Sequence, residues 1–79
     1  MDTDDFQQAQ SILAKRIKRL RKEAGMSQEI LADKAEIDRT YVSQLERSLV
    51  NPSLSVLIRV SQSLNIHVSE LLDKHSGSK

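Results

Sequence analysis

The fold is decided by residues 27–48, which read SQEILADKAEIDRTYVSQLERS. Within this stretch Ser27 is a favourable N-cap, and the apolar positions that follow it predict a helix over 28–35. Asp38 is a second favourable N-cap, and the helical spacing of Val42, Leu45 and Leu49 after it predicts a helix over 39–48. The stretch therefore predicts two short helices joined by a turn of about three residues.

The short turn forces these two helices to cross at a sharp angle, as in a helix-turn-helix motif. Such a crossing needs small residues, and Ala32 and Ala35 supply them on one side of the first helix. Close packing there would hold the second helix rigid while its far side stays exposed. We therefore expect a helix-turn-helix unit in the middle of the chain.

The rest of the chain predicts three further helices. Apolar residues recur at intervals of four, three and four along residues 7–24, which is the spacing of an amphipathic helix, and Gly25 ends it. Pro52 lies in a turn that leads into a fourth helix, Asn65 can end that helix in a left-handed conformation, and Ser69 caps a short fifth helix. The three apolar stripes consist of Leu13, Ile17, Leu20 and Ala24; of Leu54, Leu57, Ile58, Ser61 and Leu64; and of Val68, Leu71 and Leu72.

No segment alternates with the period of two that is typical of strands, and no linker separates two cores. We therefore predict an all-α fold, a compact domain of five helices over 7–75. The acidic segment 1–6 and the segment 76–79 are predicted to be disordered tails.

The charge of the chain is unevenly distributed. The formal net charge is +1, but six of the twelve basic residues fall within residues 15–22. This run is either a solvated helix face or a DNA-contacting surface, and the run alone does not decide between them.

The absence of cysteine excludes disulfides and thiolate chemistry. Together with the absence of an apparent signal peptide or membrane-spanning segment, it favours a cytoplasmic location.

The far side of the predicted helix 39–48 has an informative composition. Positions at offsets of zero, one, four, five and eight from its first residue share one face. That face contains no acid and offers guanidinium, amide and hydroxyl groups, which can hydrogen-bond base edges in a DNA major groove. A solvated face is the alternative, although such a face usually mixes both charge signs. The predicted base-reading residues are Arg39, Thr40, Ser43 and Gln44, with Arg47 on the same face.

Two opposite charges lie beside apolar stripes. Arg21 follows Ile17 by four residues, and Glu46 follows Val42 by four residues. Either charge alone would be costly to bury, so one buried ion pair between Arg21 and Glu46 explains both positions. The alternative is that both side chains extend separately to solvent.

Four runs carry a resemblance to a known family: RIKRLR at 16–21, GMSQE at 25–29 with Leu31 and Ala32 after it, YVSQLER at 41–47, and NPSL at 51–54. Through them the stretch from Lys15 to Leu72 resembles the lambda-repressor-like (Xre) helix-turn-helix family. Within that family the run Asp38-Arg39-Thr40-Tyr41 looks most like the controller proteins of restriction-modification systems. The resemblance implies a DNA-binding domain and repeats the pairing of Arg21 with Glu46.

The resemblance also implies contacts with the DNA backbone. Gln28 would touch a phosphate and brace Gln44. Independently of the resemblance, Tyr41 lies between the reading residues and the core, so it would either hydrogen-bond a phosphate with its hydroxyl or pack. Glu36 stands where the family usually has a turn glycine, so a positive φ there would cost about 1 kcal/mol, unless the turn differs slightly and tilts the reading helix. The expected phosphate contacts are Ser27, Gln28, Tyr41, Arg47, Asn51 and Ser53, which position the protein without reading sequence.

A domain of this size would gain stability from dimerisation. The expected dimer interface consists of Ile66, Val68, Leu71 and Leu72, although Leu71 and Leu72 could instead close the monomer core. Two-fold symmetry would place the two reading helices one DNA turn apart, about 34–36 Å, on a palindromic operator.

The sequence therefore predicts a sequence-specific transcriptional regulator that binds double-stranded DNA as a homodimer and regulates its own synthesis. An antitoxin of the same fold, with a toxin as its main partner, is the alternative. Glu29 and Asp33 could contact RNA polymerase if the protein is an activator, but a solvated helix face is the favoured interpretation of both residues.

No enzymatic activity, cofactor, small-molecule ligand or membrane association is expected. His67, Asp73 and His75 on a short terminal helix would make a poor metal site, so no metal is expected and surface or interface histidines are the simpler interpretation.

Overall fold

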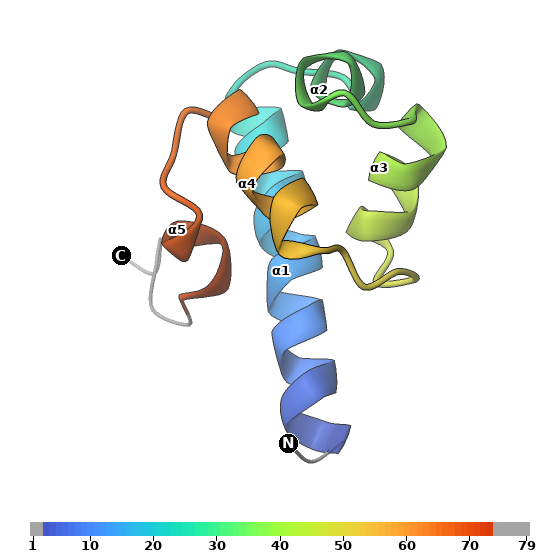
Figure 1. Ribbon diagram of the computed structural model, residues 1–79, viewed down its shortest axis with the longest axis vertical. Coiled ribbons are helices and arrows are strands. Elements are labelled where there is room, and N and C mark those ends of the chain that lie inside the picture. Colours follow the sequence, from blue (N-terminus) through green and yellow to red (C-terminus); the bar gives the residue numbers. More distant parts are fainter. Residues whose placement is uncertain (1–2, 74–79) are drawn as a thin grey trace.

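The computed structural model describes residues 3–73, and within that range it contains five helices and no strand. The predicted all-α class with five helices is confirmed. Figure 1 shows the long helix α1 along the centre of the molecule, α2 across one end of it, and α3 and α5 on opposite sides of it. The bounds are α1 Thr3–Glu23, α2 Gln28–Ala35, α3 Arg39–Glu46, α4 Leu54–Ser63 and α5 Ser69–Leu72.

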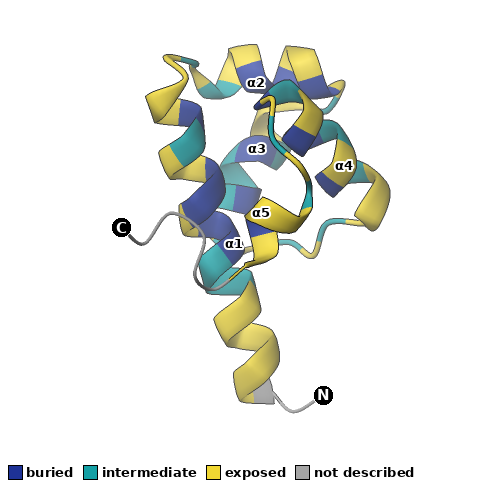
Figure 2. Cartoon of the chain, turned by 90° about the vertical axis from the view of Figure 1, so that its left-hand side faces the viewer, coloured by how far each residue is buried: buried dark blue, intermediate teal, exposed yellow. Residues whose placement is uncertain are grey.

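Helix α1 begins earlier than predicted. Its first turn includes Asp4 and Asp5, whose carboxylates interact favourably with the positive end of the helix dipole. The predicted disordered tail 1–6 is therefore helical from Thr3 onward, whereas residues 1–2 and the predicted tail 76–79 lie outside the described residues. The side chains from Asp4 to Ala9 are exposed, and this end of α1 projects beyond the other helices (Figure 2).

The core lies where α1, α2, α3 and α4 converge, and α5 closes it from the other side of α1. Ala32 and Ala35 are almost fully buried where α2 packs against α3 and α4. Small side chains at these positions allow the close approach of the helices that the short turn requires. The buried apolar cluster consists of Leu13, Ile17, Leu31, Ala32, Ala35, Val42, Leu45, Leu57, Val60, Leu64 and Leu71.

Two predicted stripes need correction. Helix α3 ends at Glu46 and not at Ser48, because Ser48 adopts a left-handed conformation with φ 60°. Leu49 consequently leaves the line of the helix face and is exposed. In α4, Leu54 is the first helical residue and is also exposed, while the sequence interpretation missed Val60, which is fully buried.

Helix α5 begins differently from the prediction. Val68, not Ser69, occupies the N-cap position, and no side chain caps this helix. The Ser69 hydroxyl instead lies 2.9 Å from Nδ1 of His67.

The turn between α2 and α3 is built on Glu36. This residue has φ 59° and ψ 45°, the left-handed conformation, and its backbone N–H donates to the carbonyl groups of Ala32 and Asp33 at the end of α2. An L residue with a Cβ is strained in this conformation, whereas glycine is not. The turn therefore has the backbone geometry that glycine usually provides at a helix C-terminus, although the residue here is a glutamate.

We expect Glu36→Gly to raise the free energy of unfolding by about 0.5–1 kcal/mol, because it relieves the left-handed strain. Urea denaturation would measure the change. The control is Asp33→Gly within α2, where glycine has no such benefit and should destabilise the helix by about 1 kcal/mol. Equal destabilisation by both substitutions would contradict the strain at Glu36.

Candidate nucleic-acid interface

A buried ion pair joins the end of α1 to the end of α3. Arg21 Nε donates to Glu46 Oε2 at 2.6 Å, and Arg21 Nη2 donates to Glu46 Oε1 at 3.0 Å. The two side chains are 9% and 2% exposed. Arg21 Nη1 also donates to the carbonyl oxygen of Met26 at 2.8 Å, so the same guanidinium holds the turn between α1 and α2.

Gln28 extends this network to the start of α2. Its Nε2 donates to Glu46 Oε1 at 3.1 Å, so one carboxylate connects α1, α2 and α3. The resemblance implied that Gln28 braces Gln44; in the structure the Gln28 amide donates to Glu46. Hydrogen bonding to Glu46 raises the pKa of Arg21 above its ordinary value, although burial opposes the shift. The guanidinium therefore stays charged, and both helices of the helix-turn-helix are fixed to α1.

The outer side of α3 is exposed, and we refer to Arg39, Thr40, Ser43 and Gln44 together as the α3 face. Arg39 and Thr40 are exposed, Ser43 and Gln44 are half-buried, and the opposite side of the helix carries the buried Val42 and Leu45. Among residues 3–73, no side-chain hydrogen bond or ion pair is found for any member of the α3 face. Their polar groups are therefore free to meet a ligand.

The residues expected to contact phosphates lie around this helix. Ser27 and Ser53 are exposed N-caps of α2 and α4, and their hydroxyl oxygens accept from the backbone N–H groups of Ile30 and Val56. Arg47 is exposed at the C-cap of α3, and Asn51 is exposed in the loop between α3 and α4. Tyr41 is half-buried and packs against the core.

The basic run of α1 divides into two kinds of residue. Arg16 is buried and donates from Nη1 to the carbonyl oxygen of Glu70, which ties α1 to α5, and Arg21 forms the ion pair with Glu46. Arg19 is exposed and pairs with Glu23 at 3.2 Å. Sequence reasoning weighed solvation against DNA contact for this run and missed the structural role of Arg16, because its partner is a backbone carbonyl 54 residues away.

The expected dimer residues differ in how far they are buried, and those that are accessible line two different hollows. Leu71 is fully buried in the monomer, so its assignment to an interface is corrected in favour of the alternative, closure of the core. Ile66 and Val68 are half-buried and line one hollow together with Ile58 and His67. Leu72 is 49% exposed and lines a separate apolar groove. That groove also contains Phe6, Ala9, Gln10, Leu13, Asn51, Pro52 and Leu57.

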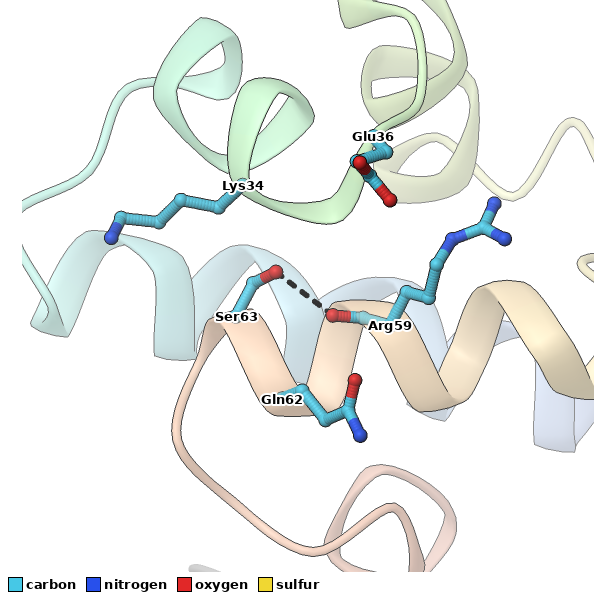
Figure 3. A pocket seen from close by; sticks show the side chains of 5 residues that line it. All are labelled: Lys34, Glu36, Arg59, Gln62 and Ser63. Carbon is cyan, nitrogen blue, oxygen red and sulfur yellow. Dashed lines mark hydrogen bonds between the residues drawn. The ribbon is translucent and has the colours of Figure 1, made fainter.

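A polar hollow of about 330 Å³ lies between the end of α2 and α4 (Figure 3). Lys34 and Arg59 extend in opposite directions from it, so their charges do not converge. Arg59 Nε donates to the carbonyl oxygen of Ala35 at 3.0 Å, and Ser63 Oγ donates to the carbonyl oxygen of Arg59 at 2.8 Å. The Arg59 hydrogen bond therefore holds α4 against α2, whereas the Ser63 hydrogen bond lies within α4.

Two classes of site are not found in the described part of the chain. Among residues 3–73, no three His, Cys, Asp or Glu side chains are grouped so that they could hold a metal ion. None of the helices in that range has the length and apolar character needed to cross a membrane.

The fold and the α3 face define a helix-turn-helix domain whose second helix exposes a face without acidic residues. The family model described as helix-turn-helix matches residues 17–71, and the chain belongs to this Xre-like helix-turn-helix family.

Curated relatives of the chain are bacterial and phage regulators. It is 44% identical over 64 residues to the HTH-type transcriptional regulator SinR of Bacillus subtilis, covering 80% of this chain and 58% of that protein. It is 47% identical over 45 residues to the immunity repressor protein of Bacillus phage phi105, covering 57% of this chain and 31% of that protein. The chain thus spans from about a third to somewhat over half of these relatives.

Solved structures support the same classification. The restriction-modification controller protein C.AhdI from Aeromonas hydrophila superimposes with a TM-score of 0.77 at 35% identity, covering 78% of this chain and 94% of that one. SinR in complex with DNA superimposes with a TM-score of 0.74 at 45% identity, covering 77% of this chain and 98% of that one. The predicted resemblance to the family, with controller proteins among its similar structures, is confirmed.

Proposed function

We propose that this chain is a sequence-specific DNA-binding regulator of transcription that reads base edges with the α3 face. The observation that carries the proposal is that exposed Arg39 and Thr40 and half-buried Ser43 and Gln44 share one side of a helix whose other side is buried. The similarity to SinR, which has been crystallised with DNA, supports it.

The ion-pair network supports this function because a reading helix must be held rigidly. Discrimination between bases depends on donors and acceptors placed within hydrogen-bonding distance of particular atoms. Glu46 fixes the end of α3 to both Arg21 and Gln28. Binding therefore requires little reordering of the protein backbone, which reduces the entropic cost of association.

In this proposal the residues divide into two roles. Arg39, Thr40, Ser43 and Gln44 contact base edges, with the Arg39 guanidinium suited to guanine and the Gln44 amide suited to adenine. The residues that would contact the backbone and set the orientation are Ser27, Gln28, Tyr41, Arg47, Asn51 and Ser53.

We further propose that the protein binds as a homodimer to a palindromic operator and regulates its own synthesis. The hollow lined by the half-buried Ile66 and Val68 supports a contact between two copies of the chain. Leu72 offers additional exposed apolar surface. A cytoplasmic location and a contact of Glu29 and Asp33 with RNA polymerase remain predictions.

Selection of bound duplexes from a random pool tests the proposed function. We expect enrichment of one sequence with two inverted half-sites whose centres lie about 10 base pairs apart. Binding without enrichment of any sequence would contradict base reading, and enrichment of a single half-site would contradict the dimer.

A change at the predicted phosphate contact Arg47 should affect all duplexes alike. We expect Arg47→Ala to weaken binding similarly for the selected operator and for an unrelated duplex, and to reduce the slope of log affinity against log salt by about 1. Fluorescence anisotropy at several salt concentrations would measure both effects. The matched control is Arg19→Ala on α1, which should leave the slope unchanged; an unchanged slope for Arg47→Ala as well would contradict the contact.

The antitoxin alternative keeps the fold and replaces DNA by a protein as the main partner. Exposed apolar side chains at Phe6, Leu54 and Leu72 favour a protein partner. Genomic neighbourhood separates the two functions, because an adjacent toxin gene supports the antitoxin and an adjacent restriction or methylation gene supports the controller.

A further inference from the structure

Gln10 connects α1 to the loop between α3 and α4. Its Nε2 donates to Oδ1 of Asn51 at 3.0 Å and, over a longer distance of 3.4 Å, to the carbonyl oxygen of Val50. Gln10 and Asn51 are 41 residues apart in the sequence. Gln10 also precedes residue 17, where the match to the family model begins. The contact therefore lies in the part of α1 that precedes the matched region.

Few hydrogen bonds hold the middle of the loop, although Val50 packs against the hydrophobic core. Among residues 3–73, no backbone–backbone hydrogen bond is found for Val50 or Asn51. Before these two residues, the backbone of Ser48 adopts a left-handed conformation, and after them Ser53 caps α4. Gln10 therefore supplies the hydrogen bonds that locate the part of the loop between these two fixed points.

The chemistry of the contact determines what Asn51 can offer to a ligand. A primary amide has one oxygen that accepts and one NH₂ group that donates. The hydrogen bond from Gln10 engages the Asn51 oxygen, so the NH₂ group is turned away from Gln10. Asn51 is exposed, and a donor on this loop suits a phosphate oxygen and not a cation.

We propose that Gln10 is a positioning residue, which orients the Asn51 amide so that its NH₂ group donates to a DNA phosphate. This inference rests on the proposed DNA-binding function and extends it to a helix segment outside the helix-turn-helix. Gln10 itself need not touch DNA, and its effect passes through Asn51.

The test uses Gln10→Met, which keeps the length of the side chain and removes its donor. We expect about five-fold weaker binding, the size of one net hydrogen bond, and the same loss on the selected operator and on an unrelated duplex. Asn51→Ala should cause a similar loss, and the double variant should lose no more than either single variant. The matched control is Gln8→Met, an exposed glutamine on the same helix, which should bind like the wild type.

A second readout needs no DNA. The side-chain NH₂ signals of Asn51 in the NMR spectrum of the free protein should shift in Gln10→Met and stay unchanged in Gln8→Met. Unchanged Asn51 signals would overturn the positioning contact. If the wild type binds duplexes and Gln10→Met binds equally well, or if the two single losses add, this inference fails while the proposed function stands. If the wild type binds no duplex at low salt, the proposed function fails and the inference with it.

Discussion

Replacement of Glu46 by alanine should lower the free energy of unfolding by about 3–5 kcal/mol, the range for breaking a buried ion pair. The substitution leaves the Arg21 guanidinium buried without its carboxylate and removes the acceptor of Gln28. Arg21→Ala should have a similar effect, because it leaves the nearly inaccessible Glu46 carboxylate unpaired. For a domain of this length the melting temperature should fall by about 12 °C or more.

Two controls separate the buried pair from charge in general. Glu23→Ala breaks the exposed pair with Arg19 and should leave the melting temperature almost unchanged. The double variant Arg21→Met with Glu46→Leu should recover much of the lost stability, since apolar side chains of similar volume often replace a buried pair without loss. If Arg21→Ala and Glu46→Ala both melted within about a degree of the wild type, the structural role of this pair would be refuted.

Arg39→Ala should lower the affinity for the selected operator by about 1–3 kcal/mol and relax the preference at one base pair. The reason is that Arg39 is exposed at the first position of α3 with a free guanidinium, the group that reads guanine through two hydrogen bonds. Repeating the selection with the variant, alongside affinity measurements on operators changed at each position, would measure both effects.

Arg47→Ala is the comparison for this experiment, because a phosphate contact weakens binding without changing base preference. Uniform weakening of every sequence by Arg39→Ala, with no position relaxed, would contradict the assignment of Arg39 to base reading.

Local patterns predicted the middle of the chain well. The Ser27 N-cap and the small alanines predicted the observed bounds of α2. Helical spacing placed Arg21 and Glu46 beside the apolar stripes of their helices, where the structure has their buried ion pair. Asn65 was expected in a left-handed conformation and has φ 61°. These features depend on neighbours within one or two helical turns, which a sequence displays directly.

The errors occur where distant residues decide the outcome. The acidic start of α1 resembled a tail because it carries few apolar residues, although its carboxylates favour a helix N-terminus. Leu71 and Leu72 are adjacent and chemically identical, and only the packing of α5 against α1 buries the first and exposes the second. Likewise, the partners of Arg16 and Gln10 lie 40 or more residues away in the sequence, where no helical spacing points to them.

The most direct test of DNA reading by the α3 face is an NMR titration of the isotopically labelled protein with the selected operator duplex. We expect the largest changes at the backbone amides of residues 39–47, with smaller changes at the N-termini of α2 and α4. If the amides of α3 stayed unchanged while those around Ile66 and Val68 shifted, the DNA would lie on another surface, and the proposed interface would be wrong.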